Sequence, residues 1–253
     1  MYPVIQVAGL TLQTAGVMAL LAGWLGLSMA AHEAKRLGIN GEIIWDAGFF
    51  GLLAGLLGAR LWYVGTNWPA YQADLRQVLA LNWGTLTSGP GVVIGSIIAL
   101  AYLQWHAVPL ARLADAVAPG LLLALAVLRV GDFLTGRVLG TPTDVPWAVE
   151  IWDVPRHPVA LYEAGAILIA LGIIWRWGRT QTYDGFVFLL AVFLASAARL
   201  FSEAYRLDSI RTIGGFRVAQ IVALAVMWIA LGVLYRKHFA VKGESSKSRT
   251  ERE

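Results

Sequence analysis

Seven stretches of about twenty mostly apolar residues constrain the fold of this chain more than any other feature. A helix that spans a membrane needs about 20 such residues, because its backbone polar groups must be satisfied within the hydrocarbon. Charged residues make up 14% of the chain, well below the share in soluble domains. The expected spans are residues 10–30, 43–64, 91–108, 113–134, 159–176, 184–205 and 216–236. The sequence therefore predicts an all-α, polytopic membrane helix bundle of about seven transmembrane helices.

The expected domain organisation is simple. Residues 1–236 are predicted to form a single transmembrane domain, and the polar residues 237–253 a disordered cytoplasmic tail. Two connections, residues 65–90 and 135–158, are long and rich in Trp, Pro and Gly. We expect both to pack on one face of the bundle.

Small residues and one proline mark two of the spans. Gly51, Gly55 and Gly58 give the second span a face suited to close helix contact. The pair Pro119-Gly120 predicts a kink or a re-entrant break in the fourth span. We find no internal repeat of the kind seen in inverted-repeat transporters, so a transporter is disfavoured.

Basic residues near the span ends predict the orientation. One side has eleven of them and the other has six. The first group is Lys35, Arg36, Arg112, Arg176, Arg179 and six residues of the C-terminal tail; the second is Arg76, Arg137, Arg156, Arg206, Arg211 and Arg217. We therefore expect the N-terminus outside and the C-terminus in the cytoplasm.

Composition excludes several classes of function. The chain has no Cys, which rules out disulfides, a cysteine-ligated metal and a cysteine nucleophile. The net charge of +4 comes largely from the tail, so no nucleic-acid patch is expected. The acidic residues do not cluster at a metal-ligand spacing, and we expect no metal and no cofactor.

Ionisable residues within the predicted spans need a partner or a function, because an arginine near the bilayer centre costs at least about 2.5 kcal/mol. They are Arg60, Arg129, Asp132, Glu163, Arg199, Glu203 and Arg206. Arg60 and Arg206 lie near span ends. Extension of their long side chains to the lipid headgroups explains these two residues as well as a functional role does. Apolar sequence flanks Arg129, Arg199 and Glu203. A buried structural ion pair, or a polar cavity whose guanidinium groups grip phosphate, would account for these three.

The run Arg156-His157-Pro158-Val159-Ala160-Leu161-Tyr162-Glu163 opens the fifth span. Pro158 disfavours helical geometry in His157 and suits the first position of the helix that follows. His157, Tyr162 and Glu163 are therefore expected together at the outer end of this span. A histidine at a helix start is either structural or a general base, and the sequence leaves both open.

Four motifs together resemble the bacterial prolipoprotein diacylglyceryl transferase family. They are the run at 156–163, Gly58-Ala59-Arg60 with Tyr63-Val64, Arg129-Val130-Gly131-Asp132-Phe133, and Ala198-Arg199 with Glu203 and Arg206. Their order and spacing agree with the family over residues 10–236. The resemblance implies transfer of diacylglyceryl from phosphatidylglycerol to the lipobox cysteine of lipoprotein precursors. It also implies the precursor's signal peptide as a partner and the bacterial cytoplasmic (inner) membrane as the location.

The resemblance further implies a role for each site residue. Arg199 and Arg60 would grip the phosphate, and Glu203 and Asp132 would orient these arginines or the incoming peptide. His157 is the best general base by residue type. Catalytic roles thus fall to Arg199, Glu203, His157 and Asp132, and substrate binding to Arg60, Arg129, Tyr162, Glu163 and Arg206.

Several positions depart from the family pattern. Ala15 replaces a tyrosine, Ser88-Gly89-Pro90-Gly91 replaces a His-Gly-Gly motif, Asp132, Thr135 and Arg137 replace two asparagines and a glutamate, and Thr141 replaces an arginine. Two alternatives therefore stay open. One is a diverged member that acts on another lipid or acceptor, and the other is a non-catalytic lipid-binding membrane protein.

Overall fold

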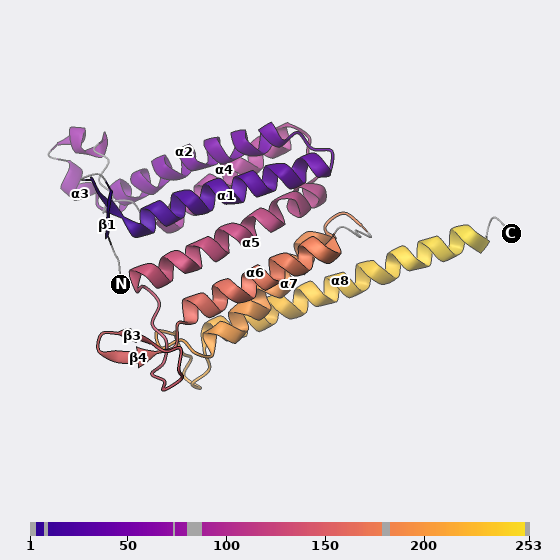
Figure 1. Ribbon diagram of the computed structural model, residues 1–253. Helices are drawn as coiled ribbons and strands as arrows, with labels where there is room; N and C mark the ends of the chain where they lie inside the picture. Colours follow the sequence, from indigo (N-terminus) through magenta and orange to yellow (C-terminus); the bar gives the residue numbers. More distant parts are fainter. Residues whose placement is uncertain (1–3, 8–9, 73, 80–87, 179–182, 251–253) are drawn as a thin grey trace. The chain divides into compact units, whose positions relative to one another are not determined.

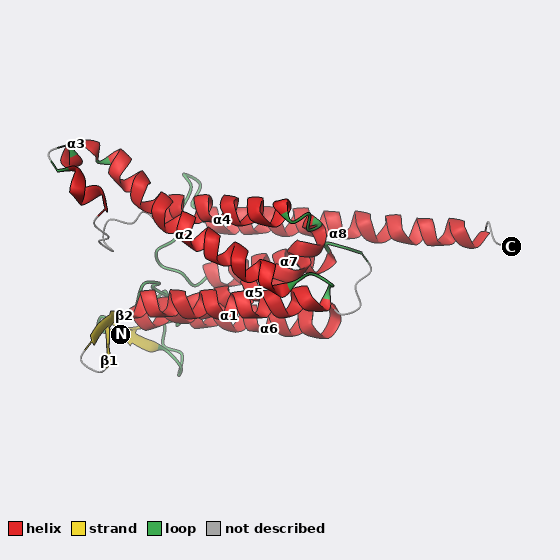
Figure 2. Cartoon of the chain, turned by 90° about the horizontal axis from the view of Figure 1, so that it is seen from above, coloured by secondary structure: helices red, strands yellow, loops and turns green. Residues whose placement is uncertain are grey.

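The computed structural model describes residues 4–7, 10–72, 74–79, 88–178 and 183–250, and most of these are helical (Figures 1 and 2). The long helices are α1 (Thr14–Arg36), α2 (Gly41–Thr66), α4 (Ser88–Trp105), α5 (Leu110–Thr135), α6 (Val159–Trp177), α7 (Phe186–Glu203) and α8 (Val218–Thr250). The short elements are α3 (Trp68–Tyr71), η1 (Leu75–Leu79) and the strands β1 (Val4–Val7), β2 (Leu10–Gln13), β3 (Val149–Ile151) and β4 (Val154–Arg156). The predicted all-α class is confirmed.

Six helices of the described chain are long and apolar enough to cross a membrane: α1, α2, α5, α6, α7 and the part of α8 up to Phe239. The remaining predicted span, 91–108, corresponds to α4, whose apolar part is shorter and ends at Trp105. Ala107 has a left-handed φ of 53°, which is incompatible with a continuing helix, and Pro109 follows two residues later. The protein is thus a polytopic helical membrane protein with six full-length candidate spans and one shorter helix.

Both ends of the bundle differ in detail from the predicted spans. Helix α1 begins at Thr14 rather than at residue 10, because Leu10–Gln13 pair with β1 as an antiparallel strand. Helix α8 continues to Thr250, through the segment from residue 237 that we expected to be a disordered tail. The single-domain assignment, the disorder of the tail and the orientation of the termini stay predictions.

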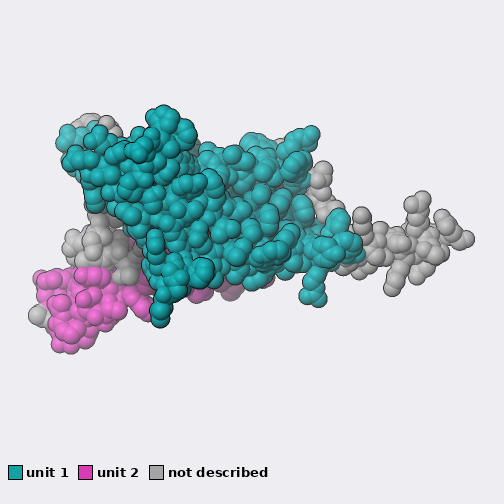
Figure 3. Space-filling model, turned by 90° about the horizontal axis from the view of Figure 1, so that it is seen from below, with its two compact units in different colours: residues 1–33, 114–253 teal, residues 34–113 magenta. Residues whose placement is uncertain are grey.

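The chain divides into two compact units (Figure 3). Unit 1 comprises residues 1–33 and 114–253, and unit 2 comprises residues 34–113. Helices α1 and α5 each run through a boundary between the units. The predicted loop 65–90 belongs to unit 2, and residues 73 and 80–87 of that loop lie outside the described residues.

Close helix contact through glycine holds unit 2 together. A Cβ on Gly51 would lie 2.9 Å from the carbonyl oxygen of Gly95, and one on Gly55 would lie 2.8 Å from that of Gly91. The numbering of these pairs runs in opposite directions, so α2 and α4 are antiparallel. The predicted small-residue face of the second span is therefore confirmed, and its partner is α4.

The apolar core of unit 1 joins α5, α6 and α7. It consists of Ala118, Leu122, Ala126, Ile167, Ala170, Leu171, Ile174, Val187, Ala191 and Ala198. Helix α5 runs through Pro119 without interruption, so of the two expected features the re-entrant break is wrong and the kink stays a prediction. The small residues around Pro119 serve packing instead, because Gly120 lies directly against the backbone of α1 at Gly26.

We expect Gly120→Ala to destabilise the protein by about 2 kcal/mol. The added Cβ would clash with the carbonyl oxygen of Gly26, and backbone cannot move aside as a side chain can. Gly172→Ala in α6 is the matched control, since a Cβ there meets nothing within 4 Å and alanine favours the helix. Thermal unfolding in detergent measures both, and a Gly120→Ala variant as stable as the control would contradict the packing described.

The loops at one end of unit 1 form what we call the end layer, residues 137–157 and 204–217. The antiparallel pair β3–β4 lies within it. Backbone hydrogen bonds from Thr141 N to Tyr205 O (2.8 Å) and from Leu207 N to Leu139 O (2.9 Å) join its two segments. The predicted loop 135–158 is therefore partly ordered as strands, and it is fixed to the C-terminal end of α7.

Candidate active site

A chain of alternating charges links three helices of unit 1 beneath the end layer. The contacts are Arg129 Nη1–Asp132 Oδ2 (2.6 Å), Arg129 Nε–Glu163 Oε1 (3.0 Å), Arg199 Nη1–Glu163 Oε2 (3.1 Å), Arg199 Nη2–Glu203 Oε2 (2.8 Å), Arg206 Nε–Glu203 Oε2 (3.8 Å) and Arg206 Nη2–Asp208 Oδ2 (3.0 Å). We call these seven residues the charge network. It brings together six of the nine predicted site residues and adds Asp208.

Glu163 is the centre of the network. Its side chain is 3% exposed, and each of its carboxylate oxygens faces a different arginine, Arg129 from α5 and Arg199 from α7. Pro158 ends the extended segment, and α6 begins at the next residue. Glu163 therefore lies one turn after the start of the helix. This one carboxylate therefore sets the separation of two guanidinium groups from different helices.

Glu203 also lies between two arginines of the network, Arg199 and Arg206. Its side chain is 2% exposed and lies between Arg199, one turn earlier on α7, and Arg206 just beyond the helix. The guanidinium of Arg217 donates to the main-chain carbonyl of Glu203. The last turn of α7 is thus held from both its side chain and its backbone.

Arg206 is bound most firmly by Asp208, which accepts from its Nε at 3.1 Å and from its Nη2 at 3.0 Å. Burial alone would lower the pKa of Arg206, but Asp208, through hydrogen bonds and charge, and two nearby glutamates raise it above its ordinary value. Arg206 is therefore a permanent cation at the border between the network and the end layer.

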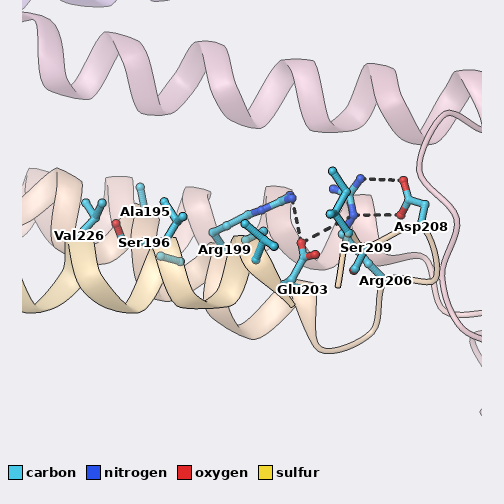
Figure 4. Close-up of a pocket in the computed structure, with 13 residues that line it drawn as sticks. Ala195, Ser196, Arg199, Glu203, Arg206, Asp208, Ser209 and Val226 are labelled. Atoms are coloured by element: carbon cyan, nitrogen blue, oxygen red, sulfur yellow. Dashed lines mark hydrogen bonds and ion pairs between the residues drawn. The ribbon is translucent and has the colours of Figure 1, made fainter. Parts of the chain in front are cut away.

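A cavity of about 590 Å³ opens beside the network, between α7 and α8 (Figure 4). Its polar end is lined by Arg199, Glu203, Arg206, Asp208 and Ser209, and the rest by Ala195, Ser196, Ile210, Val218, Ala219, Val222, Ala223 and Val226. Figure 4 shows Arg199 and Arg206 directed toward Glu203 from opposite sides. The cavity therefore has a charged end and a long apolar end, the shape of an amphiphile.

His157 and Tyr162 form a second group, next to the network but outside the lining of this cavity. His157 Nδ1 lies 3.1 Å from the hydroxyl of Tyr162, which accepts a 2.7 Å hydrogen bond from Trp147 Nε1. The ring of Tyr205 packs edge-on against both. His157 and Tyr162 are thus brought together as predicted, and Tyr162 is one residue from Glu163.

Arg60 lies in unit 2, within a local set of contacts. Its Nε donates to the carbonyl of Val78 at 3.0 Å, its Nη2 donates to that of Gln77, and its guanidinium lies 5.3 Å from the centre of the Tyr71 ring. These contacts tie the segment after α2 back to the helix. A phosphate-gripping role for Arg60 stays a prediction.

Three of the substituted family positions have structural partners in unit 1. Asp132 pairs with Arg129, Thr135 Oγ1 donates back to the carbonyl of Gly131 at 2.9 Å, and Thr141 joins the end layer through its backbone. Arg137 is exposed. Asp132, Thr135 and Thr141 are therefore each accommodated by local contacts.

Sequence reasoning missed four residues of the site: Asp208, Arg217, Trp147 and Tyr205. Asp208 follows Arg206 by two residues, a spacing that does not place two side chains on one face of a helix. Arg217 entered only the orientation count. Trp147 and Tyr205 reach Tyr162 through tertiary packing of the end layer, which no local pattern indicates.

Gly140 sits where the end layer meets this aromatic group, and a Cβ on it would clash with the carbonyl oxygen of His157. We expect Gly140→Ala to push the segment around residue 140 away from His157 and to lower the enzymatic rate by at least about 10-fold. A displacement of about 1 Å in an active site costs up to about 100-fold in rate. Gly165→Ala, in open space on α6, is the control. Activity equal to that of the control would show that the close approach is dispensable.

The fold and site define a class: a polytopic helical membrane protein with an arginine–carboxylate network at the charged end of an amphiphile-shaped cavity. A model of the prolipoprotein diacylglyceryl transferase family matches residues 3–236. The chain belongs to this family.

Individual relatives agree with this assignment. Proteins named phosphatidylglycerol–prolipoprotein diacylglyceryl transferase are similar to it in Clostridioides difficile (28% identity, 95% of this chain and 96% of the relative), Thermosynechococcus vestitus (30%, 94% and 93%) and Acaryochloris marina (31%, 91% and 88%). The similarity therefore covers nearly the whole of both chains.

Proposed function

We propose that this protein is a membrane transferase that moves the diacylglyceryl group of phosphatidylglycerol to the lipobox cysteine of lipoprotein precursors, in the bacterial cytoplasmic membrane. The family and the names of its relatives support this reaction. The observation that carries the proposal is the cavity, because arginines at one end and apolar walls along the rest match a phospholipid.

The reaction sets clear chemical demands. The sulfur of the acceptor cysteine forms a bond to the glyceryl carbon that bears the phosphate, and the carbon–oxygen bond to the phosphate breaks. Its electron pair leaves on glycerol phosphate, and the thiol proton passes to a base or to that phosphate. A thiol has a pKa near 8.5, so the site must favour the thiolate and stabilise the phosphate that departs.

Arg199 is our candidate for the group that holds the phosphate. Its side chain is 29% exposed, the highest of the arginines in the network, and it lines the cavity. Its two carboxylate partners engage Nη1 and Nη2, and a guanidinium carries five N–H donors in all. Donors therefore remain for an incoming phosphate, while Glu163 and Glu203 keep the group in place.

The remaining roles follow from position. Arg206 supplies a second cation at the same end of the cavity, and Glu203 and Asp132 orient arginines, as proposed from the sequence. His157 is the candidate base, with its Nδ1 bound to Tyr162 and its Nε2 the nitrogen left to act. Arg129 acts through Glu163. Arg60 is proposed as a phosphate-gripping residue on the resemblance alone.

Complementation tests the proposal. The intact chain is expressed in a bacterium depleted of its own diacylglyceryl transferase, and lipid attachment to a lipoprotein precursor is followed by its shift on gels. We expect attachment, and none to a precursor whose lipobox cysteine is changed to serine. A well-expressed chain that attaches no lipid would refute the proposed donor and acceptor.

The departures at Ala15, Ser88–Gly91 and Thr141 favour a second candidate, the same chemistry on another lipid or another acceptor. Purified protein with phosphatidylglycerol, phosphatidylethanolamine and cardiolipin vesicles separates the two. Transfer from phosphatidylglycerol alone supports the first candidate, and transfer only from another lipid supports the second.

A further inference from the structure

Asp115 is a buried carboxylate of α5 that the proposed reaction does not use. Its residue is 2% exposed, and it accepts backbone N–H bonds from Gly185 at 2.6 Å and from Phe188 at 2.8 Å. These two donors belong to the start of α7, where the first turn of a helix has N–H groups without a partner inside the helix. A residue of one helix thus caps the N-terminus of another.

The position of this cap matches that of the charge network at the far end of the same two helices. Asp115 and Arg129 are 14 residues apart on α5, and Gly185 and Arg199 are also 14 residues apart. At 1.5 Å per residue both separations are about 21 Å. Because Asp115 joins the two starting points, Arg129 and Arg199 arrive at the same height, where both reach Glu163.

An apolar contact would leave this register less well defined. The α5–α6–α7 core consists largely of Ala, Leu, Ile and Val, whose apolar contacts are not directional. Directional hydrogen bonds to two specific N–H groups fix a single offset, and the positive end of the α7 dipole favours an anion there. A slip of one turn, 5.4 Å, would carry Arg199 out of reach of Glu163.

We infer that Asp115 is a positioning residue for the transfer reaction: it sets the axial register of α7 on α5 and thereby the geometry of the Arg129–Glu163–Arg199 bridge. This inference rests on the proposed function for its catalytic consequence. The register itself can be measured without any activity.

The absence of Cys makes a direct measurement possible. Leu121→Cys on α5 and Phe201→Cys on α7, both exposed, accept spin labels that lie about 15 Å apart along the helix axes, and double electron–electron resonance gives their distance. We expect one distance in the labelled parent. In Asp115→Ala we expect a second population whose distance differs by about 3 to 5 Å, the change that a slip of one helical turn produces between labels offset along the axis. Asp115→Asn keeps one acceptor oxygen, so its displaced population should be smaller than that of Asp115→Ala.

Kinetics of variants without the labelling cysteines complete the test. We expect Asp115→Ala to lower kcat by about 100-fold with KM changed less than threefold, since the reacting groups and not the lipid-binding walls are displaced. The control Ile167→Val removes one methyl group from the same core and should leave both distance and kcat unchanged. If Asp115→Ala does not fold, Asp115→Asn carries the comparison.

The outcomes are separable. A shifted distance with a lowered kcat supports the inference, and an unchanged distance or an unchanged kcat overturns it. If the distance shifts but the intact parent transfers no lipid, the proposed function fails while the register role of Asp115 stands.

Discussion

Arg199→Ala is expected to lower kcat/KM for diacylglyceryl transfer by about 1,000-fold, the upper range for loss of one donor to a developing anion. The variant removes the most exposed arginine of the charge network from the charged end of the cavity. It also leaves Glu163 and Glu203 without the cation between them. Purified protein, phosphatidylglycerol vesicles and a peptide with a lipobox cysteine provide the assay.

Two further variants sharpen this prediction. Arg199→Lys keeps the charge but has no planar fork, so it cannot bridge both glutamates, and we expect an intermediate loss of about 100-fold. Ser196→Ala lies on the same wall of the cavity and should stay within threefold of the intact protein. Activity of Arg199→Ala within threefold would remove this arginine from the site.

Glu163→Ala is expected to lower the stability by about 3 kcal/mol, because two guanidinium groups in a largely buried setting lose the carboxylate between them. For a chain of this size that corresponds to a fall in Tm of roughly 6 to 12 °C. Thermal unfolding in detergent, followed by tryptophan fluorescence, measures it. Glu150→Ala, an exposed position on β3, should change Tm by less than about 2 °C.

A double variant tests whether charge is the cause. Adding Arg129→Met to Glu163→Ala removes one of the two cations that have lost Glu163 as a partner and should recover part of the lost stability. Activity should not return, because the bridge to Arg199 stays broken. A double variant less stable than Glu163→Ala would show that packing, and not charge, dominates at this position.

Much of this fold can be predicted from the local pattern of apolar residues. Five of the long spans were predictable to within a few residues, because membrane insertion demands runs of apolar residues that no other constraint imitates. The errors came from short-range geometry. The end of α4 depends on the left-handed Ala107, and the start of α1 depends on a strand pair that forms with residues nearer the N-terminus.

The residues of the site could be predicted from the sequence, but the contacts between them could not. Charge within apolar sequence singled out Arg129, Glu163, Arg199 and Glu203, because such charges are costly and need a partner. The pairing of Arg129 with Glu163 joins residues 34 positions apart and depends on how α5 and α6 pack. Asp115 was passed over, since nothing local indicates that its partners are backbone groups of α7.

The distribution of partners in the charge network has a consequence for biogenesis. Arg129 carries its own counter-ion, Asp132, one turn away on α5, and Arg199 carries Glu203 on α7. Each of these helices can leave the translocon as a nearly neutral unit. Glu163 has no such partner among the contacts within α6, but the ribosome delivers α6 after α5. Arg129 is therefore already inserted when Glu163 enters the membrane, and Arg199 on α7 completes the bridge last.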